Sequence, residues 1–163
     1  MDNTESLLWQ VRAFIYKYFA DTTLPPSIEE TAQHFNIIIK EAGTLYRELH
    51  NRHALFLEPE TLTIRMANPF SGIPTDFKVH LNSKTYYANC AWDMLGIPAV
   101  LHSDAVIEAI CTESNDSVQL EIRDAKIAQA AVPCEASLWD GGNGLLVHFP
   151  LPFARWYDDL TFT

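Results

Sequence analysis

The amino-acid sequence predicts an α+β protein in which an N-terminal winged-helix-like three-helix module is followed by a mixed α+β domain with a mainly antiparallel sheet. Two observations support this class. The first third of the chain repeats apolar residues at the three- and four-residue spacing of amphipathic helices, whereas the rest consists mostly of short strand-like runs separated by polar turns. With 163 residues, 48% of them hydrophobic, the chain is long enough to bury the core of one domain or of two small ones.

Three helices are predicted in the first 51 residues. Apolar residues recur at helical spacing over 6–20, and a second such pattern covers 39–51. Between them, Ser27 and Glu30 have the spacing of a capping box, in which each residue satisfies a backbone N–H of the other, and they begin a short helix over 27–35. Three helices in this order are typical of a winged-helix module.

A β-hairpin is expected to complete that module. Residues 54–58 and 61–66 alternate in apolar character around a proline-containing turn. The segment 66–75 then has two prolines and a glycine, which is the composition of a connector. The sequence therefore predicts a winged-helix-like domain over 1–66 and an α+β domain over 67–163.

Six short strands and one helix are predicted in the second domain. The strands cover residues 77–81, 85–88, 105–111, 117–123, 126–132 and 145–149. The helix begins at Cys90, with Asn89 as its N-cap, and is expected to stop at about Leu95 because Gly96 and Pro98 follow. Strands joined by short polar turns indicate a mainly antiparallel sheet.

The charge balance argues against nucleic acid as a partner. The chain has 11 basic and 21 acidic residues, a net charge of −10, and residues 1–66 alone have six basic against nine acidic side chains. Such a surface repels a phosphate backbone. We expect no nucleic-acid partner.

The remaining composition indicates a cytoplasmic protein without a membrane partner. Apolar runs are far shorter than the roughly 20 residues of a membrane-spanning helix, and the amino terminus is acidic, unlike a signal peptide. An odd number of cysteines, with neither a disulfide framework nor a zinc-binding spacing, indicates thiols in a reducing compartment; they are Cys90, Cys111 and Cys134. No motif for a cofactor is present, and none is expected.

The most informative segment for chemistry is YYANCAWDMLGIPAVL, residues 86–101. A cysteine at a helix start lies near the positive end of the helix dipole, which predicts a lowered pKa for the Cys90 thiol and favours binding of soft metals. Asp93, three residues later, lies on the same helical face and is suited to proton transfer. Trp92 and His102 are candidate pocket residues. The alternative is that Cys90 is a small buried side chain and Asp93 complements the dipole.

This segment, the later AVIEAICTESNDSVQLEI and the predicted winged-helix start together resemble the organomercurial (alkylmercury) lyase family. The resemblance implies a winged-helix-like module joined to an α+β catalytic domain that cleaves carbon–mercury bonds by protonolysis. It implies that Cys90 is the first catalytic thiol and the mercury ligand, for substrate or product, and that Asp93 helps to deliver the proton to the leaving carbon. Soft thiolates bind mercury strongly, and a nearby acid can protonate the departing carbon.

The resemblance also implies a second catalytic thiol. In the family it lies in a carboxy-terminal segment that aligns just beyond Thr163, so we expect the chain to stop short of it. Cys111 aligns with a cysteine that the family treats as structural. Cys134 has no counterpart in the family and is the candidate second thiol within this chain, provided that its loop reaches Cys90.

The leading hypothesis is therefore an alkylmercury-lyase-like enzyme acting on a small organomercurial. A second hypothesis is a thiol pocket of the same fold that binds a soft metal or another soft electrophile without turnover. A third is a winged-helix regulator whose second domain senses a ligand. Neither the physiological substrate nor the oligomeric state follows from the sequence.

Overall fold

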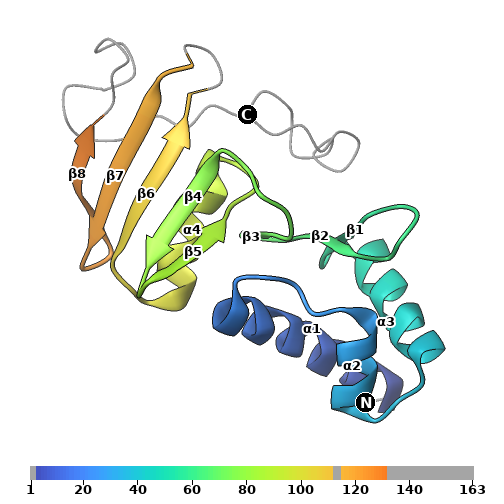
Figure 1. Ribbon diagram of the computed structural model, residues 1–163. Helices are drawn as coiled ribbons and strands as arrows, with labels where there is room; N and C mark the ends of the chain where they lie inside the picture. Colours follow the sequence, from blue (N-terminus) through green and yellow to red (C-terminus); the bar gives the residue numbers. More distant parts are fainter. Residues whose placement is uncertain (1–2, 112–114, 132–163) are drawn as a thin grey trace. The chain divides into compact units, whose positions relative to one another are not determined.

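The computed structural model describes residues 3–111 and 115–131, and the chain forms two compact units that divide between Pro74 and Thr75 (Figure 1). In the described residues, helices come first and an antiparallel sheet follows. The predicted α+β class, with a helical module before a mainly antiparallel domain, is confirmed. No helix in these ranges has both the length and the apolar character needed to cross a membrane.

The first unit begins with α1 (Asn3–Thr22), α2 (Ile28–Phe35) and α3 (Ile39–Asn51). The predicted capping box is present at the start of α2: the Glu30 backbone N–H donates to Ser27 Oγ at 3.1 Å, and the Ser27 backbone N–H donates to Glu30 Oε2 at 2.7 Å. The predicted bounds of α3 are confirmed, and α1 is a few residues longer at each end than its apolar pattern indicates.

Aromatic and aliphatic side chains from all three helices form the core of this unit. The buried face of α1 contributes Val11, Ile15 and Phe19, none of which is exposed. The ring of Phe70 stacks on Phe19 with 5.3 Å between ring centroids, so the core includes a residue from outside the helices. Burial of this apolar surface holds the three helices together.

A three-stranded antiparallel sheet follows, with β1 (Phe56–Leu57), β2 (Ile64–Ala67) and β3 (Phe70–Ser71) in that order. The predicted hairpin corresponds to β1 and β2. The segment expected to be only a connector instead contains β3, because Gly72 lets the chain run close to β2: a Cβ at Gly72 would lie 2.1 Å from the Ile64 carbonyl oxygen. Glycine alone permits this approach.

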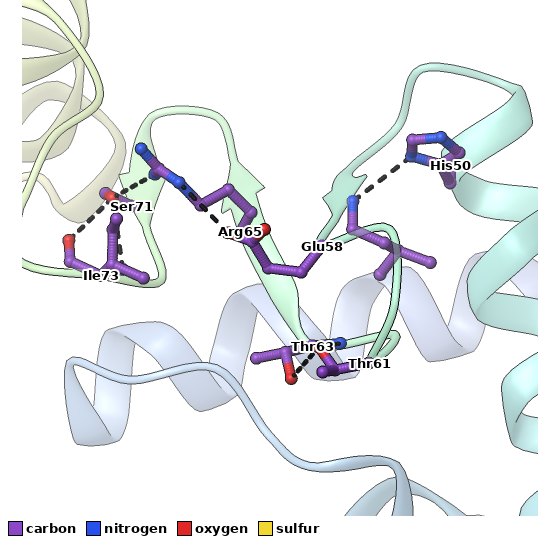
Figure 2. A network of polar contacts seen from close by, with 8 residues as sticks. His50, Glu58, Thr61, Thr63, Arg65, Ser71 and Ile73 are labelled. Atoms are coloured by element: carbon purple, nitrogen blue, oxygen red, sulfur yellow. Dashed lines mark hydrogen bonds and ion pairs between the residues drawn. The ribbon is translucent and has the colours of Figure 1, made fainter. Parts of the chain in front are cut away.

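Polar contacts hold β3 and the strand before it in place, as Figure 2 shows. The Arg65 guanidinium donates to Ser71 Oγ at 3.1 Å and lies 3.5 Å from a carboxylate oxygen of Glu58. Ser71 Oγ in turn donates to the Ile73 carbonyl at 2.8 Å. These contacts fix the end of the first unit.

The second unit is built on a five-stranded antiparallel sheet of order β5-β4-β6-β7-β8. The strands are β4 (Phe77–Leu81), β5 (Lys84–Tyr87), β6 (Ala105–Ile110), β7 (Ser117–Arg123) and β8 (Lys126–Ala131). Val79, Ile107 and Leu120 lie opposite one another on β4, β6 and β7 and are fully buried. This face of the sheet is the core of the unit. The strand predicted over 145–149 lies outside the described residues.

The helix α4 (Ala91–Leu101) packs against this sheet near β4 and β6 (Figure 1). The prediction that it stops at about Leu95 is wrong, since Gly96 and Pro98 lie inside it. A proline within a helix costs one backbone hydrogen bond. Burial of Ile97 and Pro98 against the sheet offsets that loss.

Candidate functional site

The candidate site lies where the chain leaves β5 and enters α4. Two hydrogen bonds hold Ala88 at this point: its N–H donates to the Phe77 carbonyl at 2.9 Å, and its carbonyl accepts from Thr75 Oγ1 at 2.6 Å. Cys90 follows in an extended conformation and is the N-cap of α4, and the Met94 N–H donates to the Cys90 carbonyl at 3.1 Å. The sheet therefore fixes the position from which the helix starts.

Cys90, Asp93 and Asn89 form one buried cluster at this helix start. Cys90 is 9% exposed and Asn89 is 7% exposed, and Asp93 lies on the first turn with only partial exposure. The Asp93 carboxylate and the Cys90 thiol share a hydrogen bond. The side-chain amide of Asn89 donates to Asp93 Oδ2 at 3.0 Å. The structure thus brings together the two residues that the sequence singles out.

Burial dominates the electrostatics of the thiol. It raises the pKa of Cys90 to about 11, and the negative charge of Asp93 acts in the same direction. Hydrogen bonds from the backbone N–H groups of Trp92 and Asp93 lower this pKa, as expected at a helix start, but by less. The prediction of a lowered Cys90 pKa is therefore wrong, because the helix dipole is outweighed by the loss of water around the sulfur.

Burial also raises the pKa of Asp93, to about 6, while hydrogen bonds from Asn89 and Cys90 act against this shift. At neutral pH the cluster thus pairs a protonated thiol with a largely ionised carboxylate. The thiol donates its hydrogen bond to the carboxylate. Chemically, this is a thiol with a proton acceptor already in contact with it.

The other predicted site residues do not join the cluster in the same way. Trp92 is on the first turn of α4 with 57% of its surface exposed. His102 is the C-cap of α4, at the opposite end from Cys90 and about 18 Å away at 1.5 Å per helical residue. The structure therefore does not place His102 in a pocket with Cys90.

The other two cysteines differ in what the structure describes. Cys111 is a partly buried thiol just after β6, where its N–H donates to the Asp116 carbonyl at 2.8 Å and closes the turn toward β7. Cys134 lies outside the described residues. Within the described ranges, no group of three or more His, Cys, Asp or Glu side chains is arranged to hold a metal ion.

The sequence predicts Asn89 as the N-cap of α4, but this prediction is wrong: Cys90 is the N-cap, and the Asn89 amide instead donates to Asp93. The signal was available, because Asn89 and Asp93 are four residues apart, a spacing that brings side chains together around a helix start. What the sequence lacked was the burial of the amide, which depends on the sheet.

Comparisons with known proteins agree with this segment as the informative one. Residues 70–138 match the family model for alkylmercury lyase (MerB). A crystal structure described as "the mercury-bound form of MerB2" has the same fold, with a TM-score of 0.61 and 20% sequence identity. The match covers 78% of this chain and 65% of that one, so this chain spans a little under two thirds of that protein's length. No curated protein matches. The family model thus confirms the predicted resemblance to the alkylmercury lyase family over residues 70–138, and the MerB2 structure confirms the fold.

Proposed function

We propose that this protein is an alkylmercury-lyase-like enzyme in which Cys90 binds a small organomercurial and Asp93 carries the proton that releases the hydrocarbon. The observation that carries the proposal is the buried contact between the Cys90 thiol and the Asp93 carboxylate, within the segment that matches the family model. A carboxylate in contact with a thiol supplies both roles that protonolysis needs.

The first step is exchange at mercury. The Cys90 sulfur forms a bond to the mercury of R–Hg–X, the bond from mercury to X breaks, and X leaves as an anion. The thiol proton moves to the Asp93 carboxylate. A thiol with a pKa of about 11 is rarely ionised in water at neutral pH. Mercury nevertheless favours this step because it is soft and binds thiolate strongly. The Asp93 carboxylate, which accepts the proton, is already hydrogen-bonded to the thiol.

The second step is protonolysis. Asp93, now a carboxylic acid, gives its proton to the carbon bound to mercury, and the electron pair of the carbon–mercury bond stays with that carbon. The products are R–H and Hg(II) on the Cys90 sulfur, and Asp93 is a carboxylate again. A pKa of about 6 suits both halves of this cycle, because an acid–base group works best with a pKa close to the working pH.

The product ion needs a further soft ligand before it can leave Cys90. Cys134 is the candidate within the chain, and a thiol from solution would serve in the same way. The exposed indole of Trp92, one residue before Asp93, is proposed to contact the organic group of the substrate.

The test uses phenylmercury acetate with a small thiol in excess. Mass spectrometry of the intact protein and its peptides should show one phenylmercury group on Cys90, and gas chromatography should detect released benzene. The Cys90→Ser variant should lose both signals, whereas the matched Cys111→Ser variant should keep both. A Cys90 adduct without benzene from the wild-type protein would support the binding-only hypothesis and contradict the enzyme.

A further inference from the structure

We infer that Asn89 is a positioning residue of this site, whose side-chain amide fixes the Asp93 carboxylate in one orientation beside the Cys90 thiol. The catalytic meaning of this inference rests on the proposed function. The contact itself is a property of the folded chain and can be measured without any mercury compound.

The geometry supports a defined contact. Asn89 Nδ2 lies 3.0 Å from Asp93 Oδ2, and the asparagine is 7% exposed. An ionised carboxylate only accepts hydrogen bonds, so the amide must present its nitrogen and not its oxygen to Asp93. The hydrogen bond is charge-assisted and correspondingly strong. A carboxylate has two oxygens and several lone pairs, so Asp93 can accept from Asn89 and from Cys90 together.

The backbone on either side of Asn89 is held in place. Ala88 is fixed by hydrogen bonds to Phe77 and Thr75 on one side, and Cys90 begins the first turn of α4 on the other. The amide therefore approaches Asp93 from a segment that hydrogen bonds hold on both sides, and the carboxylate is not held by its own helix alone. Sites need this kind of support, because small displacements of a catalytic group are costly.

A neutral amide is well suited to this position. The Asn89 hydrogen bond lowers the pKa of Asp93 and so opposes the effect of burial. A cation in its place would lower the pKa of Asp93 so far that the carboxylate would not take up the proton that it must return. An aliphatic side chain would donate no hydrogen bond, so the carboxylate could turn away from the thiol and would be ionised to a smaller extent at neutral pH.

A purely structural role is the competing explanation. Asp93 is the third residue of α4, a position at which acidic side chains commonly cap helix starts, and on this explanation Asn89 only strengthens that cap. Loss of a cap alters stability. It does not by itself move the pH dependence of a reaction at Cys90, so the two roles can be separated.

The decisive variant is Asn89→Leu, which has a similar size and no donor. The control is Gln119→Leu, the same loss of an amide at an exposed position of β7. A ¹³C NMR titration follows the Asp93 carboxyl group. In the Asn89→Leu protein, Asp93 should bind its proton about tenfold more tightly than in wild type, and in the control protein its proton affinity should be unchanged. The acidic limb of the pH profile for benzene release should move to higher pH, with kcat lowered more than KM is changed.

An Asn89→Leu protein that keeps the wild-type titration and pH profile would overturn the inference. If this variant fails to fold, Asn89→Ala replaces it; alanine has no side-chain donor, so the same changes are expected. The titration also separates the two proposals. A shifted Asp93 titration with no benzene from wild type would contradict the lyase function alone, whereas benzene release with an unshifted titration would contradict the role of Asn89 alone.

Discussion

Replacing Asp93 with asparagine should make the protein more stable at neutral pH, although it removes a functional group. Burial raises the pKa of Asp93 from an ordinary 3.8 to about 6 in the folded chain. The folded state thus holds this proton more tightly than the unfolded state does. The stability that results is fully present below about pH 4 and is lost as the pH rises through about 6.

The size of the effect follows from the two pKa values. At pH 7 the ionised Asp93 lowers the free energy of unfolding by about 3 kcal/mol relative to a side chain that stays neutral, and at pH 4 by only about 0.5 kcal/mol. Asparagine has nearly the same shape and never ionises. Any change in packing or hydrogen bonding affects both pH values alike, so the difference between them, about 2 kcal/mol, isolates the titration of Asp93.

Urea unfolding of both proteins at pH 4 and pH 7 measures this difference. Trp9 is the one tryptophan of the first unit, so a Trp9→Phe background makes tryptophan fluorescence report on the second unit. The Asp93→Asn protein should gain stability at pH 7 and much less at pH 4. An equal effect at the two pH values, or a loss of stability at pH 7, would refute the conclusion that burial raises the pKa of the Asp93 carboxyl group.

Three further predictions concern the thiol and the first unit. At pH 7, iodoacetamide should alkylate Cys90 about a hundredfold more slowly than it does in the urea-unfolded chain, because the pKa of the folded thiol is about 11 instead of 9; equal rates would contradict the burial of the sulfur. Gly72→Ala should destabilise the first unit by about 2 kcal/mol or more, since its Cβ would meet the Ile64 carbonyl oxygen at 2.1 Å. An unchanged urea midpoint of the helical far-UV circular dichroism signal would show that β2 and the chain at Gly72 are not in close contact. Tyr46→Phe should lower the free energy of unfolding by about 1–3 kcal/mol in the same assay, because it leaves the buried hydroxyl of Thr31, 2.7 Å away, without that partner. An additional Thr31→Val substitution should recover part of the lost stability. Fully additive effects of the two substitutions would argue against the hydrogen bond.

The parts of the fold that the sequence predicted well are those fixed by local chemistry. The start of α2 is determined by the reciprocal bonds of Ser27 and Glu30, and its predicted end at Phe35 agrees with the structure. The turn between β4 and β5 falls at the predicted Asn82 and Ser83, both with positive φ, a conformation that asparagine tolerates well. Such signals depend on a few neighbouring residues and not on the packing of distant parts of the chain.

The differences arise where distant parts of the chain decide the outcome. Gly96 and Pro98 are local stop signals, yet α4 continues because its apolar residues are buried against the sheet. The helix dipole at Cys90 is likewise a local signal, and the pKa of the thiol is set instead by burial beside Asp93. The pairing of Cys90 with Asp93 could be predicted from spacing, whereas the environment that determines their protonation could not.

Release of hydrocarbon in heavy water tests the central claim most directly. Wild-type protein, incubated in D₂O with phenylmercury acetate and excess thiol, should release benzene that contains one deuterium, because the proton on Asp93 exchanges with solvent before it reaches carbon. The Asp93→Asn protein should form the phenylmercury adduct on Cys90 and release almost none. Benzene released by Asp93→Asn at the wild-type rate would contradict the account, since it would show that the proton reaches the carbon by another route.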